Sequence, residues 1–72
     1  MIRTRLDYAL LDKQMKLKDL AEATGLAVNN LSILKTNKAR AIRFSTLNAI
    51  CKALECTPGD LIEYVPDEDK DF

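Results

Sequence analysis

The chain has 72 residues, with 11 Lys or Arg balanced by 11 Asp or Glu. This length supports one small domain and excludes a large multidomain enzyme, because a single hydrophobic core needs about 50 to 200 residues. The zero net charge is unevenly distributed: residues 1–43 hold nine cations and four acids, and residues 44–72 hold two and seven. We therefore expect the first part of the chain to meet any polyanionic partner.

The sequence also limits the compartment and the metal chemistry. No segment approaches 18 uncharged apolar residues, and none resembles a secretory signal. We expect a cytoplasmic protein that does not bind membranes. There is no His, and Cys51 and Cys56 lie five residues apart on a helix and its end. We expect this spacing to point the thiols in different directions, which predicts reduced cysteines, no metal site and no cofactor.

The first predicted helix spans residues 6–14, where apolar residues recur at helical spacing. Thr4, with Asp7 three residues later, resembles a capping box at its start. The second predicted helix spans residues 17–24. It ends there because Gly25 follows, at a position where a left-handed C-terminal cap favours glycine.

The third predicted helix spans about residues 28–36, with Leu31 and Leu34 facing inward and Asn37 as its terminator. It follows the second helix after a short turn that contains Gly25. Two short helices joined in this way are typical of a helix-turn-helix, although any tight helical hairpin has similar requirements.

Residues 38–44 carry three cations and no acid, which indicates a loop. We expect a fourth helix capped by Ser45, because the most regular apolar stripe of the chain follows and ends at Leu54. Thr57, with Asp60 three residues later, predicts the start of a short fifth helix.

Two short strands complete the prediction. Residues 62–65 alternate in polarity until Pro66, and residues 2–5 can pair with them. This pairing aligns Arg3 or Arg5 with Glu63. It also places three apolar side chains on one side of the two-stranded sheet, where a second chain could bind, namely Ile2, Ile62 and Tyr64.

The residues of the second and third helices resemble a known family. Leu20–Leu26 and Leu31–Lys35 are similar to the lambda-repressor and Cro type helix-turn-helix regulators, the XRE family. Ala41–Phe44, Ile50–Leu54 and Pro58–Tyr64 resemble a small single-domain subgroup. The resemblance implies an all-α, five-helix, lambda-repressor-like DNA-binding domain over residues 1–66, followed by an acidic flexible tail, residues 67–72. It also implies a transcriptional regulator, with repression as the expected activity, that usually acts as a homodimer.

The chain departs from the family pattern at several helix ends. Lys16 and Leu17 stand where the family often has a Ser or Thr cap followed by Gln. Ala27 replaces the frequent Ser or Thr cap of the recognition helix. Gln14 and Asn37 occupy positions where glycine is usual.

The resemblance assigns the third helix to the major groove of double-stranded DNA. Asn29 is the first candidate, because an asparagine side chain can bond adenine in a bidentate manner, and apolar neighbours can pack against thymine methyl groups. We therefore expect an A·T-containing half-site. The expected base-contacting residues are Val28, Asn29, Asn30, Ser32 and Ile33.

Cations flank the predicted recognition helix. In the family the loop after this helix runs beside the sugar-phosphate chain, although a solvated loop would have a similar composition. The expected phosphate-contacting residues are Lys16, Lys18, Lys35, Lys38, Arg40 and Arg43.

Other function classes fit the sequence less well. Catalysis is not expected, because there is no His, no glycine-rich phosphate loop and no carboxylate pair marked by spacing. A small-molecule ligand is not expected in so short a chain. The alternative to DNA binding is a protein-interaction module of the same fold, antitoxin-like or adaptor, using the exposed apolar residues of the third helix.

Overall fold

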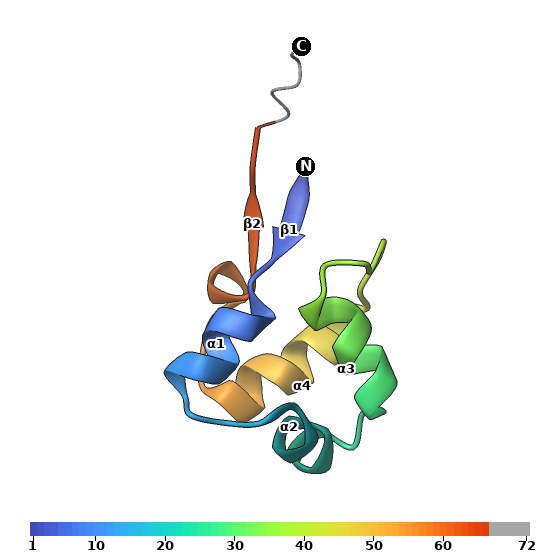
Figure 1. The fold of residues 1–72 in the computed structure, drawn as a ribbon, viewed down its shortest axis with the longest axis vertical. Helices are drawn as coiled ribbons and strands as arrows, with labels where there is room; N and C mark the ends of the chain where they lie inside the picture. The colour runs from blue at the N-terminus through green and yellow to red at the C-terminus, as the bar shows by residue number, and fades with distance from the viewer. Residues whose placement is uncertain (67–72) are drawn as a thin grey trace.

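The computed structural model describes residues 1–66, and the predicted acidic tail, residues 67–72, lies outside them. Figure 1 shows a body of helices from which a two-stranded sheet projects. We call it the terminal sheet, because its strands come from the two ends of the described chain. The elements in chain order are β1 (Ile2–Thr4), α1 (Leu6–Asp12), α2 (Leu17–Thr24), α3 (Val28–Lys35), α4 (Phe44–Leu54), the 3-10 turn η1 (Pro58–Asp60) and β2 (Ile62–Tyr64). None of these helices is long and apolar enough to cross a membrane.

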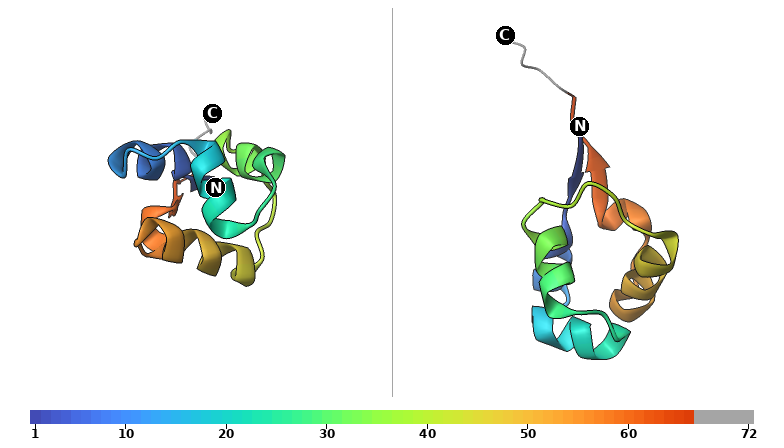
Figure 2. Two further views of the ribbon diagram at one scale, coloured as in Figure 1. Left: turned by 90° about the horizontal axis from the view of Figure 1, so that it is seen from below. Right: turned by 90° about the vertical axis from the view of Figure 1, so that its right-hand side faces the viewer.

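The core is formed where the apolar stripes of the helices meet. Leu20 of α2, Leu31 of α3 and two residues of α4, Ile50 and Leu54, are almost completely buried. The views in Figure 2 show the helices arranged around this centre. All ten buried core residues are apolar, so the stability of the body depends on hydrophobic burial.

The predicted pairing of β1 with β2 is confirmed; the strands are antiparallel, and of the two alternatives Arg3 rather than Arg5 lies opposite Glu63. The Arg3 guanidinium lies 3.1 Å from the Glu63 carboxylate and that of Arg5 lies 3.9 Å from it. In this register Ile2 and Tyr64 face each other on one side of the terminal sheet. The pairing joins the two ends of the described chain.

The prediction of five helices is wrong in one respect, because the fifth element is a single 3-10 turn, η1, and four α-helices are present in residues 1–66. The predicted cap of this element is confirmed. Asp60 accepts hydrogen bonds from the Thr57 N–H at 3.0 Å and from the Thr57 hydroxyl at 3.1 Å. The chain then enters β2, whose pairing with β1 replaces further helical bonds.

Two other predicted caps are wrong. Ser45 does not cap α4, because the helix starts at Phe44 with Arg43 in the N-cap position. Thr4 does not cap α1, because its hydroxyl donates to the Leu34 carbonyl and its N–H donates to the Asn37 side chain at 3.0 Å. A tertiary contact with the end of α3 has therefore taken the place of the local capping bond.

The expected divergence of the two thiols is also wrong. Glu55 adopts a left-handed conformation, with φ of 53°, and ends α4. The chain turns back there, so the Cys56 N–H donates to the Cys51 carbonyl at 3.0 Å. The Cys51 thiol is close enough to contribute to the raised pKa of the Cys56 thiol. A spacing of five separates two side chains only along a continuous helix.

Candidate nucleic-acid interface

The turn between α2 and α3 is built by the end of α2. Gly25 has φ of 76°, and its N–H donates to the Ala21 carbonyl at 2.8 Å. The Thr24 hydroxyl accepts the Leu26 N–H at 3.2 Å and donates to the Leu20 carbonyl at 2.7 Å. Glycine suits this turn because a left-handed φ costs other residues about 1 kcal/mol or more. These bonds fix the direction in which α3 leaves α2.

One face of α3 is anchored in the core, through Leu31 and Leu34. The opposite face is open: Val28 is 48% exposed and Ile33 45% exposed. Asn29 and Asn30 are exposed too, whereas Ser32 is only half-exposed. Of the five predicted base-contacting residues, four therefore lie on the accessible face and Ser32 lies at its margin.

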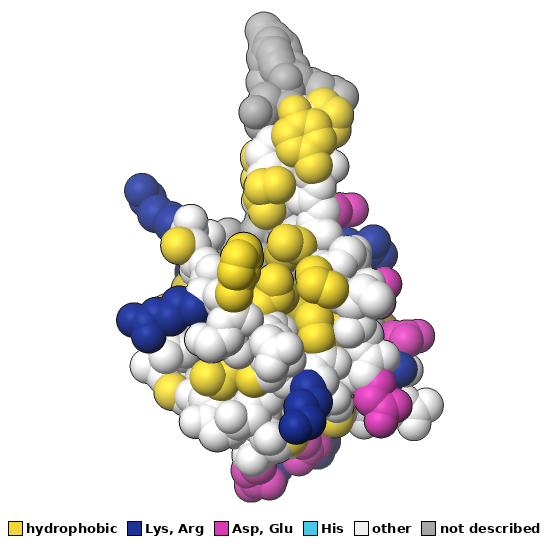
Figure 3. Space-filling view, turned by 180° about the vertical axis from the view of Figure 1, so that it is seen from behind, with side chains coloured by type: hydrophobic (Ala, Val, Ile, Leu, Met, Phe, Trp, Pro, Cys, Tyr) yellow, Lys and Arg dark blue, Asp and Glu magenta, His cyan; other side chains and the backbone are white. Residues whose placement is uncertain are grey.

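A groove of about 600 Å³ runs between α3 and the loop that follows it. It brings Asn30 and Ile33 of α3 together with three of the predicted phosphate-contacting residues, namely Lys38, Arg40 and Arg43. In Figure 3 the left-hand flank of the molecule carries dark blue cations with no magenta acid beside them. The side of the groove formed by the loop is thus positively charged, and it lies next to the accessible face of α3.

The remaining predicted cations lie outside this groove. Lys35 is exposed in the last turn of α3, where it complements the helix dipole. Lys16 and Lys18 are exposed at the start of α2. They form a second group of positive charge rather than a part of the groove.

The helices that border these cations begin without a cap from the side chain of the N-cap residue, although at α2 the Asp19 carboxylate accepts the Lys16 N–H at 3.2 Å. Lys16, Ala27 and Arg43 are the N-cap residues of α2, α3 and α4, and none makes a side-chain cap hydrogen bond. The free N–H groups of a helix start attract anions. A cation in the N-cap position interacts unfavourably with the positive end of the helix dipole. Arg43, whose helix has no acid in its first turn, therefore suits an anion more than it suits folding.

The structure adds Thr46 to the groove, a residue that the sequence reading missed. It belongs to the first turn of α4, three residues after Arg43, where its side chain reaches the groove wall. The signal in the sequence was the cation-rich loop directly before it.

Comparison with known proteins agrees with this arrangement. Residues 5–67 match the Cro/C1-type HTH DNA-binding domain family. The chain is 55% identical over 67 residues to YozG, an HTH-type transcriptional regulator of Bacillus subtilis, covering 93% of this chain and 80% of the relative.

Two solved structures have the same fold. One is a candidate DNA-binding protein of Bacteroides fragilis, with a TM-score of 0.77, 28% identity and coverage of 88% of this chain and all of that one. The other is the transcriptional regulator VanUg, with a TM-score of 0.71, 34% identity and coverage of 90% and 88%. The chain belongs to the Cro/C1-type helix-turn-helix DNA-binding family.

Proposed function

We propose that the protein is a transcriptional regulator, acting in the cytoplasm, that reads double-stranded DNA by placing α3 in the major groove. The observation that carries this proposal is the groove beside α3, where the amide of Asn30 lies with Lys38, Arg40 and Arg43. An exposed recognition face next to unpaired cations supplies both kinds of contact that specific binding needs, to base edges and to phosphates. Repression is the simplest outcome, because a small bound domain can block a promoter.

Asn29 is the proposed main reader of sequence. It is exposed in the first turn of α3, the part of a recognition helix that meets base edges. Val28 and Ile33 offer methyl groups for thymine, which favours an A·T-containing half-site. Asn30 and Ser32 complete the proposed set, with Ser32 limited by its partial burial.

Phosphate contacts are assigned to the two groups of cations. Lys38, Arg40 and Arg43 would lie along one strand of the duplex beside the groove. Lys16, Lys18 and Lys35 would approach the flanking backbone from α2 and the end of α3. The uncapped N–H groups of α4 would add to the first group, since they lie next to Arg43.

A homodimer is proposed to place two such domains on one operator. Ile2 is 64% exposed and Tyr64 is 68% exposed. These two apolar side chains share a face of the terminal sheet with Ile62. Figure 3 shows hydrophobic side chains along the terminal sheet and at its base. Contacts between two such faces would bury these side chains, and two half-sites would multiply a weak single-domain affinity.

Selection of bound duplexes from a random library at about 0.1 M salt tests the function. Enrichment of an A·T-containing site is the expected result, and an inverted repeat with half-sites about 10 bp apart would indicate a dimer. Failure to enrich any site at concentrations well above about 10 nM would overturn the proposal and favour a protein partner.

Asn29→Ala then tests the assignment of the reader. We expect a loss of about 1 to 3 kcal/mol on the enriched site and little change on a scrambled duplex, because a base contact discriminates sequence and a phosphate contact does not. Asn48→Ala is a matched control, since Asn48 is an exposed asparagine on α4. An equal loss on both duplexes would remove Asn29 from the base readers.

A further inference from the structure

The two cysteines meet at the carboxyl end of α4. Cys51 lies in the last turns of the helix and Cys56 lies two residues beyond it. Both are free thiols of intermediate burial and both pack against the core. They are therefore held by the fold and are not mobile surface groups.

The backbone brings these two residues within bridging distance. The left-handed Glu55 allows the Cys56 N–H to donate to the Cys51 carbonyl at 3.0 Å. Given the lengths of the bonds on either side, this hydrogen bond keeps the two Cα atoms within about 7 Å of each other. A disulfide needs such a separation or a shorter one. In this type of helix end the side chains of the same two positions commonly touch, and here the Cys51 side chain contributes to the raised pKa of the Cys56 thiol.

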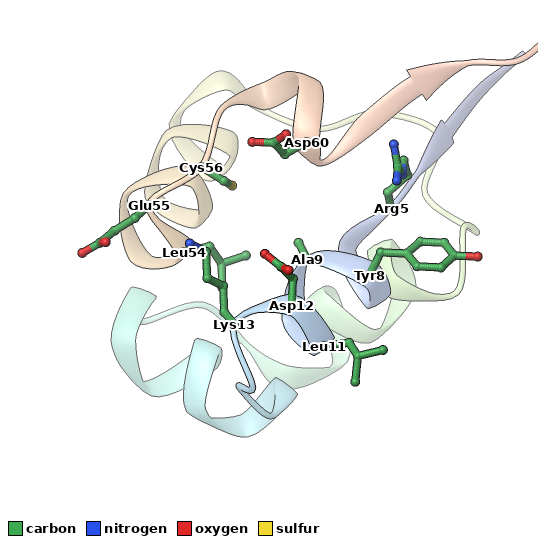
Figure 4. Close-up of a pocket in the computed structure, with 10 residues that line it drawn as sticks. All are labelled: Arg5, Tyr8, Ala9, Leu11, Asp12, Lys13, Leu54, Glu55, Cys56 and Asp60. Atoms are coloured by element: carbon green, nitrogen blue, oxygen red, sulfur yellow. The ribbon is translucent and has the colours of Figure 1, made fainter.

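One of the thiols opens into a cleft. A cleft of about 490 Å³ lies between α1 and the segment from the end of α4 to η1. Figure 4 shows Cys56 on its wall. Two cations, Arg5 and Lys13, and three acids, Asp12, Glu55 and Asp60, line the same cleft, so its charges do not select an anion over a neutral small molecule. The cleft shares no lining residue with the groove beside α3.

We propose that Cys51 and Cys56 form an oxidative modification site that closes reversibly into an intramolecular disulfide when a small disulfide, such as oxidised glutathione, enters this cleft. The Cys56 thiolate attacks one sulfur of the small disulfide and releases one thiolate. The Cys51 thiolate then attacks the Cys56 sulfur and releases the second. The small disulfide is reduced to two thiols, which take up the two protons lost by the cysteines, and one new S–S bond joins Cys51 to Cys56.

The charges around Cys56 set the pH dependence of the first step. Burial raises the pKa of the Cys56 thiol above its ordinary value of 9.0, and the neighbouring Cys51 and Asp60 raise it further, whereas Lys13 lowers it. The thiolate is the attacking form, so closure should be slow at neutral pH and become faster as the pH approaches 9. The other ionisable side chains along the cleft are Arg5, Tyr8, Asp12 and Glu55.

Mass spectrometry and thiol titration of the whole chain test this site. The protein is treated with oxidised glutathione at pH 7 and at pH 8.5, and free thiols are then blocked with an alkylating reagent. We expect the single chain to lose the mass of two hydrogen atoms, to lose both titratable thiols and to regain them with dithiothreitol. Closure should be at least several-fold faster at the higher pH.

Serine variants separate the two steps. Cys51→Ser should stop at the mixed disulfide on Cys56, since no second thiol resolves it, and Cys56→Ser should retain its single thiol for longer. The wild-type result needs no variant to fold. The proposal is overturned if wild-type protein stops at the mixed disulfide, cross-links between chains, or keeps both thiols while a denatured sample oxidises. None of these outcomes depends on DNA binding.

Discussion

At the scale of single residues, the positive backbone angles outside glycine are informative. Gln14 has φ of 53°, Asn37 of 65° and Glu55 of 53°. Two of these, Gln14 and Asn37, are the positions where the family usually has glycine. Asn37 uses its side chain, which accepts the Thr4 N–H at 3.0 Å, so the replacement gains a contact with β1. Gln14 is exposed and has no comparable role to offset the strain of its backbone.

Gln14→Gly should therefore stabilise the protein by about 0.5 to 1 kcal/mol, because relief of the left-handed strain exceeds the entropy that glycine loses on folding. Urea denaturation with an unchanged slope measures this difference. Gln14→Val is the opposing control, since a β-branched side chain tolerates this conformation poorly and should destabilise the fold. Equal stability of the three proteins would show that the strain is absorbed elsewhere.

Asp60 gives the fold a pH dependence in acid. Hydrogen bonds from the Thr57 N–H and hydroxyl hold the pKa of the Asp60 carboxyl below its ordinary value of 3.8. A lowered folded pKa contributes stability that is complete above the unfolded value and is lost as the pH falls through the folded one. Asp60→Asn should therefore reduce stability at neutral pH and lose less of it on acidification.

Thermal unfolding between pH 6 and pH 2.5 checks this prediction. Asp12→Asn removes the same charge from α1, and its curve should follow that of the wild type more closely than Asp60→Asn does. If the wild-type and Asp60→Asn curves stay parallel throughout, the carboxylate cap does not contribute to acid stability.

At the scale of elements, the start of α4 combines poor capping with positive charge. Arg43 occupies the N-cap position without a side-chain cap, and the first turn of the helix holds no acid. This arrangement costs stability, because a cation meets the positive end of the helix dipole. It suits a phosphate, which would interact favourably with both the side chain and the free N–H groups.

Arg43→Ala should consequently separate binding from stability. We expect weaker binding to every duplex and a salt slope lower by about one unit, with stability unchanged or higher by about 0.3 to 1 kcal/mol. Arg40→Ala is the matched comparison, because Arg40 lies in the same groove but away from a helix start. It should weaken binding without any gain in stability. An Arg43→Ala protein that keeps the wild-type salt slope would contradict the phosphate assignment.

The elements also show which features sequence can predict. The bounds of α2 and α3 follow from apolar spacing and from Gly25. The pairing of the two strands follows from charge complementarity, which left Arg3 and Arg5 as alternative partners of Glu63, and the structure selects Arg3. These signals are local or depend on simple complementarity. The cap predicted at Thr4 failed because a local pattern cannot reveal that the Leu34 carbonyl competes for the Thr4 hydroxyl. The cap predicted at Ser45 failed because α4 begins one residue earlier, at Phe44. The contact between the thiols was missed because the left-handed Glu55 has no strong sequence signal.

For the candidate site, the sequence predicted its faces better than its boundaries. The inward positions of Leu31 and Leu34 determined which α3 side chains are exposed, so most of the expected readers lie where they were expected. The grouping of cations was less predictable. Lys38, Arg40 and Arg43 share a groove with α3, whereas Lys16 and Lys18 lie apart, and this division depends on how the loop after α3 folds back.

At the scale of the whole molecule, the terminal sheet exposes apolar side chains, Ile2 and Tyr64, at the end where the described chain begins and finishes. Its backbone leaves an open edge: Arg5 donates to Leu61 at 2.6 Å, and Val65 donates to Met1 at 2.8 Å. The bonds between the strands thus alternate, so the N–H and C=O groups of Ile62 and Tyr64 point away from β1. An open edge beside exposed apolar side chains favours association with a second copy.

Tyr64→Asp tests whether this end forms the proposed dimer. At tens of micromolar, sedimentation should give the wild type twice the mass of one chain and the variant the mass of one chain, because two facing carboxylates would be buried without partners. Leu11→Asp is the matched control, because Leu11 is 76% exposed on α1 and is not part of the terminal sheet. The Leu11→Asp protein should remain dimeric. On a duplex with a single half-site, Tyr64→Asp should bind like the wild type, whereas on an inverted repeat it should lose the added affinity of two linked domains. A wild type that sediments as one chain would refute a dimer in the free state. An unchanged affinity of Tyr64→Asp for the inverted repeat would show that this face of the terminal sheet does not form the dimer contact.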